Sequence, residues 1–122
     1  MNTVDIGTTR FTKIKVVDES GDDGACNSYE IIPSEEETFR ISHLPIAQIQ
    51  FQNGPVPDKG VNGIFIEDLL AICIHRLNGF QTGKLACTFN ANAVEHIELA
   101  LQFLQARTED RKDRGVEGTT QR

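Results

Sequence analysis

The first half of the chain alternates apolar and polar residues over short segments, which is the pattern of half-buried β-strands. Residues 11–17 and 46–51 alternate most clearly, and residues 29–32 and 38–41 are rich in β-branched and aromatic side chains. A turn-rich acidic segment, residues 18–24, follows the first of them. We therefore expect a small antiparallel sheet with a β-hairpin across this segment.

The second half of the chain has an apolar period of three and four residues, which predicts amphipathic helices. One stripe consists of Ile66, Leu69, Leu70, Cys73 and Leu77. Asn62 is its expected N-cap, and Asn78 with Gly79 its expected end. Further apolar residues lie outside this stripe: Phe65, Ile72 and Ile74. We therefore expect this helix to pack on two sides, against the sheet and against another helix or subunit.

A second helical stripe consists of Val94, Ile97, Leu101 and Leu104. Asn92 and Glu95 have the spacing of a capping box at its start, and we expect the helix to run past Arg107. The connection over residues 79–90 is too short to cross a sheet, so the two helices should form an antiparallel hairpin. The predicted fold is α+β, a small N-terminal antiparallel β-sheet followed by a long antiparallel helical hairpin.

Composition fits one domain of 122 residues, because 39% of the residues are hydrophobic and 25% are charged. Within it we expect a strand-rich part over about 1–56, the hairpin over about 62–114, and a C-terminal motif and tail over 115–122. No apolar run reaches the roughly 18 residues of a membrane span, and no secretory signal is visible, so we expect a soluble intracellular protein.

The three cysteines are odd in number and widely spaced, which indicates a reducing compartment rather than disulfide staples. Cys73 and Cys87 have apolar neighbours, and we expect both to be buried as small hydrophobic residues.

The formal net charge of −6 argues against binding of duplex nucleic acid, whose affinity depends on Lys and Arg. Eight acids and no base lie between Asp18 and Glu37, so the rest of the chain is mildly basic. We expect this acidic segment to be a solvated tip. A calcium loop is excluded, because Asp18, Asp22 and Asp23 lack the alternating ligand spacing and the terminal glutamate.

Candidates for catalysis are poor. His43, His75 and His96 share no metal-ligand spacing, and neither a nucleophile elbow nor a phosphate-binding P-loop is present. We therefore expect no enzymatic activity, no cofactor and no metal.

The most informative residues are Arg107, Arg111 and Arg114, which share one face if the second helix continues through them. They can form a fork for phosphates, which arginine binds in bidentate fashion. The alternative is a solvated helix end whose acids pair with these arginines. Gly115, Gly118 and Thr119 follow, and they fit either a backbone cradle for a ligand or a glycine-terminated helix with a tail.

Phe80 is an aromatic residue at the expected end of the first helix, and its alternatives are core packing or stacking on a ligand base. An antiparallel hairpin separates Phe80 from Arg107 within one chain, whereas an antiparallel dimer can bring one copy's Phe80 beside the other's arginines. A nucleotide at a subunit interface is the ligand that this arrangement suggests.

Several ordered segments resemble the phage anti-Thoeris sponge family, whose helical hairpin is shared with the phage anti-CBASS cyclic-oligonucleotide sponges. The matching segments are residues 49–56, 60–63, 68–72, 76–81, Arg107-Thr108 and residues 114–119. The resemblance implies a protein that binds, without cleaving, the cyclic ADP-ribose isomer (gcADPR) of TIR-domain defence, in the cytoplasm of the infected bacterium. It also implies a homodimer that assembles further into a hexamer.

By matching motifs, the resemblance assigns base stacking to Phe80, a ribose or phosphate contact to Asn90, and phosphate contacts to Arg107 and Arg111. Some family members have a separate site for cyclic trinucleotides, and here its motif matches the following residues: Arg114, Gly118 and Thr119. Two other functions stay open, a hydrolase of such a nucleotide and a protein-interaction module with an apolar helix as its interface.

Overall fold

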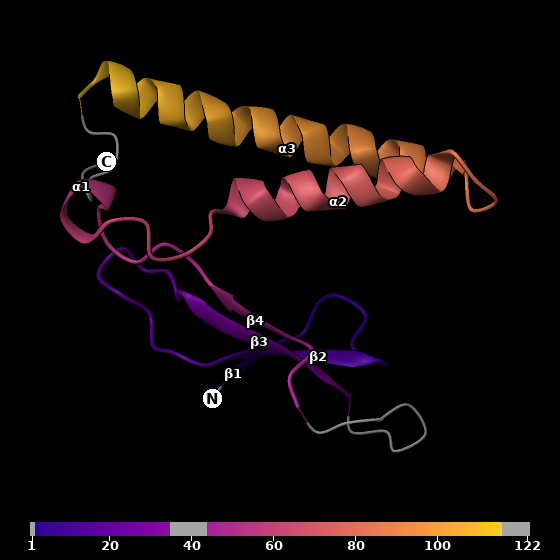
Figure 1. Ribbon diagram of the computed structural model, residues 1–122, viewed down its shortest axis with the longest axis horizontal. Coiled ribbons are helices and arrows are strands. Elements are labelled where there is room, and N and C mark those ends of the chain that lie inside the picture. Colours follow the sequence, from indigo (N-terminus) through magenta and orange to yellow (C-terminus); the bar gives the residue numbers. More distant parts are fainter. Residues whose placement is uncertain (1, 35–43, 116–122) are drawn as a thin grey trace. The chain divides into compact units, whose positions relative to one another are not determined.

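The computed structural model describes residues 2–34 and 44–115, and the chain forms two compact units. The first unit comprises Met1–Gly54 and Lys59–Ile64, and the second comprises Pro55–Asp58 and Phe65–Arg122. A four-stranded antiparallel sheet precedes a helical hairpin, which confirms the predicted α+β class (Figure 1).

The sheet of the first unit has the strand order β1-β2-β3-β4, with every neighbouring pair antiparallel. Its strands are β1 (Asn2–Val4), β2 (Thr12–Val16), β3 (Ser28–Pro33) and β4 (Ala47–Gln50). The strands predicted over 11–17, 29–32 and 46–51 are confirmed to within about two residues. The sequence pattern missed β1, whose three residues are too few to show alternation, and the strand predicted over 38–41 lies outside the described residues.

Strand register gives the sheet one apolar face and one polar face. Ile14 pairs with Ile31 and Tyr29 pairs with Ile49, so apolar side chains of three strands share a face. The opposite face carries Lys13, Lys15, Glu30, Gln48 and Gln50, together with the apolar Ile32. The apolar face also includes an aromatic contact, because the Tyr29 and Phe51 rings meet edge to face at 5.7 Å.

Residues 19–25 at the tip of the β2–β3 hairpin are exposed, which confirms the predicted solvated tip, and acidic side chains also hold its turn together. The Asp18 carboxylate accepts hydrogen bonds from the backbone N–H groups of Asn27 (2.9 Å) and Ser28 (3.1 Å). Asp23 accepts another from the N–H of Ala25 at 3.0 Å. These carboxylates satisfy donors that the turn leaves without strand partners. Partial burial raises the pKa of the nearby Tyr29 phenol above its ordinary value of 10.0, with Cys26 and Asp18 adding to the shift.

The chain leaving β4 is held by side-chain amides and by a parallel bridge between Phe51 and Ile64. Asn62, the predicted N-cap, lies here instead: its side chain accepts from the Asn53 N–H (2.8 Å) and donates to the Asn53 carbonyl (2.7 Å). The Gln52 side chain accepts from the Asn62 N–H at 2.9 Å and donates to the Gly60 carbonyl at 2.8 Å. Gln52 and Asn62, which lie in segments that resemble the family, therefore stabilise the fold. The single-turn helix α1 (Val56–Lys59) interrupts the segment.

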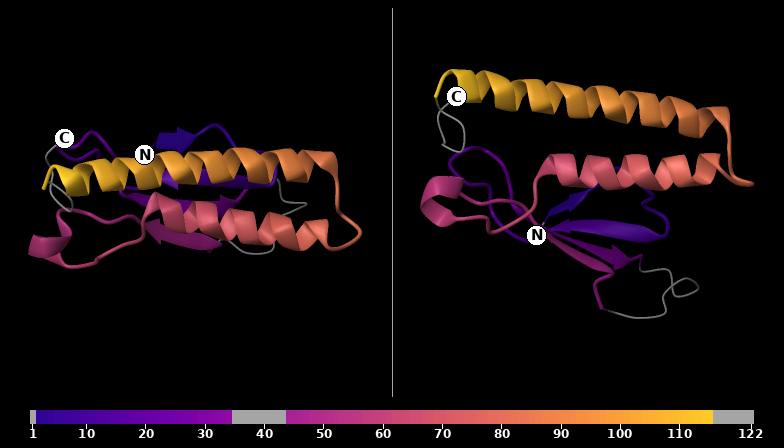
Figure 2. Two further views of the ribbon diagram at one scale, coloured as in Figure 1. Left: turned by 90° about the horizontal axis from the view of Figure 1, so that it is seen from above. Right: turned by 45° about the horizontal axis from the view of Figure 1, so that its top comes forward.

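The second unit contains the hairpin of α2 (Ile66–Gln81) and α3 (Thr88–Asp113), which run antiparallel (Figure 2). The predicted helices are confirmed, but three of the predicted ends are wrong. Phe65 precedes α2, and its N–H donates to the Asp68 carboxylate at 2.9 Å. α2 ends at Gln81 rather than at Asn78. α3 begins four residues before Asn92, with the Cys87 sulfur accepting from the N–H of Asn90 at 3.5 Å.

Each helix has a seam of less exposed residues at alternating three- and four-residue steps, the spacing of coiled-coil packing. In α3 the seam contains the predicted stripe, and Val94 is 8% exposed. In α2 this spacing joins Glu67, Leu70, Ile74, Leu77 and Gln81, and two residues beside the seam, Leu69 and Phe80, are also partly buried. The predicted α2 stripe is therefore rotated from the observed one. Cys73 is exposed, as is Cys87, so the prediction that both are buried is wrong.

α3 runs past Arg107, as predicted, and ends at Asp113. Arg114 is its C-cap, and Gly115 follows with a φ of 75°, a left-handed conformation that glycine adopts without strain.

Gly63→Ala tests the close packing of the segment that follows β4. A Cβ at this position would lie against the Phe51 backbone, 2.5 Å from its carbonyl oxygen and 2.6 Å from that of Gln50. We expect a loss of about 2 kcal/mol in the free energy of unfolding, measured with urea. Gly21→Ala is the matched control, because its Cβ would make only ordinary contacts, the nearest at 3.7 Å. Equal stability of the two variants would contradict the assignment.

Candidate functional site

An open pocket of about 610 Å³ lies along the outward side of α2. Its lining residues are Ala71, Ile72, His75, Arg76, Gly79 and Phe80. They form two parallel ridges with four-residue spacing, since Ile72, Arg76 and Phe80 make one ridge, and the remaining three residues make the other. The first ridge carries the large side chains, and the second begins and ends with the small residues Ala71 and Gly79. The pocket is thus a groove with one high wall, built from a single helix.

The wall of this pocket is held by a cation–π contact. The Arg76 guanidinium carbon lies 4.9 Å from the centroid of the Phe80 ring, one helical turn away. Arg76 is exposed and Phe80 is partly exposed. The contact covers one side of the ring with a cation and restricts its rotamers. A planar ligand group can stack on an aromatic ring held in this way, and a guanidinium beside it can bind an anion.

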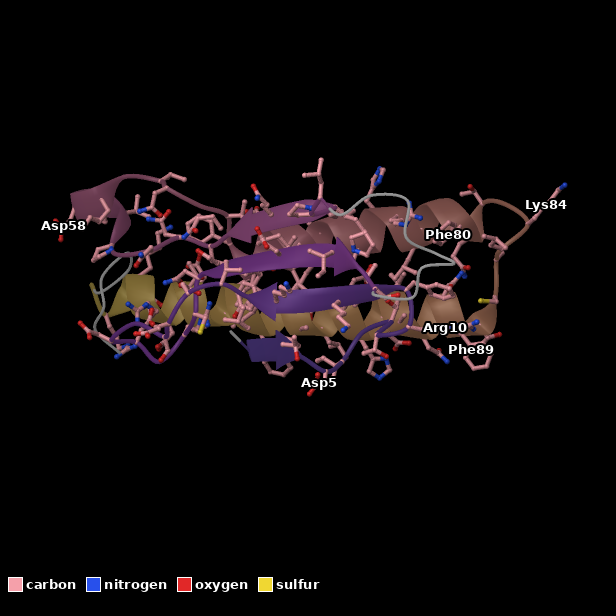
Figure 3. All side chains as sticks on the ribbon, turned by 90° about the horizontal axis from the view of Figure 1, so that it is seen from below. Asp5, Arg10, Asp58, Phe80, Lys84 and Phe89 are labelled. Atoms are coloured by element: carbon pink, nitrogen blue, oxygen red, sulfur yellow. The ribbon has the colours of Figure 1, made fainter. Side chains whose placement is uncertain are left out.

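Phe80 lies in the last turn of α2, at the end of the helix as predicted. Asn90 lies in the first turn of α3, so both residues are at the loop end of the hairpin, where Figure 3 labels Phe80, Lys84 and Phe89. The Asn90 side-chain amide donates to the Leu85 carbonyl at 3.0 Å. This bond uses one donor of Asn90 and leaves its carbonyl oxygen available to a ligand hydroxyl.

The loop between the helices is fixed by Gln81. Its side chain donates to the Cys87 carbonyl at 3.0 Å and accepts from the Cys87 N–H at 3.0 Å. Two hydrogen bonds from one amide hold the start of α3 against the end of α2. The spacing between Phe80 and Asn90 is therefore set by the hairpin itself.

The predicted arginines lie at the opposite end of the hairpin. A rise of 1.5 Å per residue places Arg107 about 28 Å along α3 from Thr88. This confirms the prediction that Arg107 and Phe80 lie far apart within one chain. Figures 1 and 2 show α3 continuing past the first residue of α2. Arg107 is exposed and forms no ion pair with any residue that the structure describes, whereas Arg111 is partly exposed.

The alternative interpretation, a solvated helix end whose acids pair with the arginines, holds for Arg114, because its Nε lies 3.1 Å from the Asp110 carboxylate. Both side chains are about half exposed or more, so this ion pair contributes little stability. Gly118 and Thr119, which the resemblance adds to Arg114, lie outside the described residues, as does His43.

Titratable groups near the pocket are few. His75 lines it, and the Nδ1 of His96 on α3 lies 2.7 Å from the Asn92 carbonyl oxygen. Across residues 2–34 and 44–115, no group of three or more His, Cys, Asp or Glu side chains could hold a metal ion. None of the helices that the structure describes is long and apolar enough to cross a membrane.

Sequence reasoning missed Arg76 and Gly79 as pocket residues. In the sequence, Arg76 looks like an ordinary cation on an exposed helix. Its four-residue spacing to Phe80 was the signal that could have indicated a contact between the two side chains. Gly79 was interpreted as a helix end, whereas it lies inside α2.

A double-mutant cycle tests the Arg76–Phe80 contact. We expect Arg76→Gln and Phe80→Leu to couple by about 0.5 kcal/mol in the free energy of unfolding, since the pair is partly solvated. Urea unfolding at one fixed protein concentration measures this energy. The control cycle combines Arg76→Gln with Phe103→Leu on α3, for which we expect no coupling. Equal coupling in the two cycles would mean that the ring contact contributes nothing.

Comparison with known proteins covers all of α2 and most of α3. Residues 45–109, more than half of the chain, match the family model described as "Acb2/Tad1, hairpin domain". A relative, "Thoeris anti-defense 1" of Bacillus phage SBSphiJ7, is 47% identical over 74 residues, which are 61% of this chain and 52% of that protein. The chain thus spans about half the length of the curated relative it matches. It belongs to the Acb2/Tad1 hairpin-domain family, the phage anti-Thoeris, anti-defence family that its sequence resembles.

Proposed function

We propose that this protein binds and sequesters, without cleaving it, a cyclic ADP-ribose isomer that serves as the signal of TIR-domain (Thoeris) immunity. The observation that carries the proposal is the pocket on α2, where the Arg76 guanidinium lies 4.9 Å from the Phe80 ring centroid. The adenine base of the ligand stacks on the Phe80 ring, and the phosphates of the ligand need arginine donors. Membership of the anti-Thoeris family supports this choice of ligand.

A sink must bind tightly, because it competes with an effector at low signal concentration. Nanomolar affinity corresponds to roughly −12 kcal/mol. Stacking contributes roughly 1–3 kcal/mol per base, and each arginine fork adds charge-assisted hydrogen bonds to phosphate. Tight binding is sufficient for this role, since sequestration requires no bond to be broken.

Two copies of the chain complete the proposed site. Phe80 and Asn90 lie at one end of the hairpin, and a rise of 1.5 Å per residue places Arg107 about 26 Å and Arg111 about 32 Å along α3 from Asn90. A cyclic dinucleotide-sized ligand cannot span that distance within one chain. An antiparallel homodimer places the arginines of one copy beside the phenylalanine of the other, and additional contacts that join three such dimers build a hexamer.

Cyclic trinucleotides are the second class of ligand that we propose, at a separate site that includes Arg114, with Gly118 and Thr119 assigned to it by the family motif. The exposed position of Arg114 at the end of α3 is compatible with this role. Independent sites predict that saturation with one ligand leaves the affinity for the other unchanged, which sequential calorimetric titrations measure.

A protein-interaction module is the alternative that the surface favours. Phe89 and Phe103 on α3 are 85% and 74% exposed, and such aromatic residues are common anchors in protein interfaces. Copurification of a host protein, together with no heat of binding to any cyclic ADP-ribose isomer, would favour this function over the proposed one.

Replacing Phe80 tests the stacking contact. We expect Phe80→Ala to weaken the binding of a cyclic ADP-ribose isomer about 10-fold or more, because a stacking surface is lost. Phe80→Trp is the matched control and should retain binding, since a larger aromatic face remains. Isothermal titration calorimetry measures both, and circular dichroism checks that the helices are intact. Unchanged affinity of Phe80→Ala would remove this residue from the site.

Mixing two variants tests whether the site is shared between copies. Phe80→Ala and Arg107→Ala should each bind weakly alone, and mixing them after brief unfolding and refolding should restore binding. The mixed dimer has one site with both side chains present, so up to half of the mixed dimer's sites are intact. Lys112→Ala removes a positive charge from the next turn of α3 and is the control for Arg107→Ala. Lack of restoration would contradict a site shared between chains.

Recovery of the ligand tests sequestration against hydrolysis. We expect a cyclic ADP-ribose isomer to be released intact and in stoichiometric amount when the bound protein is denatured by heat. Liquid chromatography measures the ligand after long incubation with a catalytic amount of protein. A cleaved product in excess over protein would establish a hydrolase instead.

A further inference from the structure

We infer that Gly79 is a specificity-determining residue of the α2 pocket, kept as glycine so that a flat ligand ring can approach the helix beside Phe80. The inference rests on the proposed function and adds the reason for a residue that the family motif alone does not explain. The inference follows from the presence of glycine at a helical position where it lowers helix stability and where no contact within the chain requires it.

Glycine is the poorest helix former after proline, yet Gly79 lies within α2, two residues before its end. Its φ is not in the left-handed region, so the backbone conformation suits any residue. A Cβ built at Gly79 would meet nothing within 4 Å. Neither backbone geometry nor packing within the chain therefore requires glycine here.

The position of Gly79 in the groove supplies a reason. It lines the pocket next to Phe80, at the low end of the ridge that starts with Ala71. The neighbouring ridge carries the Arg76–Phe80 pair, whose guanidinium already covers one side of the ring. Because Gly79 and Phe80 line the same pocket, a methyl group at Gly79 would take up part of the space that a base stacked on Phe80 would use. Residues that lower stability without a structural need are expected at ligand sites.

The opposite effects of Gly79→Ala on stability and binding provide the test. We expect this variant to raise the thermal midpoint by about 4 °C, because alanine favours the helix. It should weaken nucleotide binding by about 10-fold or more, as an added methyl group does in a fitted pocket. Asn78→Ala is the matched control, since Asn78 is exposed, adjacent in α2 and outside the pocket. It should raise the midpoint and leave the affinity unchanged.

Binding is measured with two probes in the Phe80→Trp background, where the introduced tryptophan is the only one in the chain. One probe is a cyclic ADP-ribose isomer, and the other is adenosine diphosphate, a generic flat-ring diphosphate that reports access to the pocket. If only adenosine diphosphate quenches the parent protein, and Gly79→Ala loses this quenching, the result supports the role of Gly79 and contradicts the cyclic ADP-ribose isomer as the ligand. Equal quenching in Gly79→Ala and its parent would overturn the inference and leave the proposed function intact.

Two further outcomes would also overturn the inference. If neither probe quenches the tryptophan in the parent protein, the groove is not a nucleotide site, and the glycine has no role there. If Gly79→Ala lowers the assembly mass in light scattering without nucleotide, the glycine serves close contact between helices of two copies.

Discussion

The seam between α2 and α3 is the constraint on which the candidate site depends. Less exposed residues recur along both helices at alternating three- and four-residue steps, so rotation of α2 about its own axis is fixed. Leu70, Ile74 and Leu77 take the seam side. Ile72 and Phe80 then have to lie on another face, and Ile72 is 62% exposed there. The pocket is therefore a consequence of how the hairpin packs.

Placement of charge, rather than its sum, decides what this acidic protein can bind. Asp18 and Asp23 are used by the β2–β3 hairpin, where they accept backbone hydrogen bonds. Arg76 is the residue with a full positive charge among the pocket residues, and it lies against an aromatic ring. A net charge of −6 disfavours a long polyanion, whose binding depends on many cations at once. It places much less restriction on a small diphosphate, which needs only a few arginines at one point.

Prediction from the sequence succeeded where a single apolar stripe exists. Val94, Ile97 and Leu101 admit one seam for α3, and the structure has that seam. α2 is apolar on two faces, so periodicity alone could not decide whether Cys73 or Ile74 lies on the seam side. The predicted stripe placed Cys73 there as a buried residue, whereas Cys73 is exposed. Helix ends were missed for a related reason. A capping asparagine is recognised by type, but Asn62 uses its side chain on Asn53.

The candidate site shows the same limit. Phe80 stands out in the sequence as an aromatic residue beside a glycine, and Arg107 as part of a row of arginines. Arg76 and Gly79 have no such appearance, because their role depends on which face of α2 is outward. That face is set by packing against α3, a tertiary fact that no local pattern contains.

Scarcity of buried apolar surface would couple folding to the proposed assembly of copies. Among the residues that the structure describes, Val94 is the one apolar residue exposed by less than 9%, while large side chains such as Phe89 and Phe103 are mostly exposed. A domain of this length normally buries more apolar surface to offset the conformational entropy lost on folding. Contacts between copies can supply that burial, and the stability of the chain then depends on protein concentration. A ligand that bridges two copies adds its binding free energy to the same equilibrium. Under the proposed function, tight binding of the signal and a stable assembly would therefore reinforce each other.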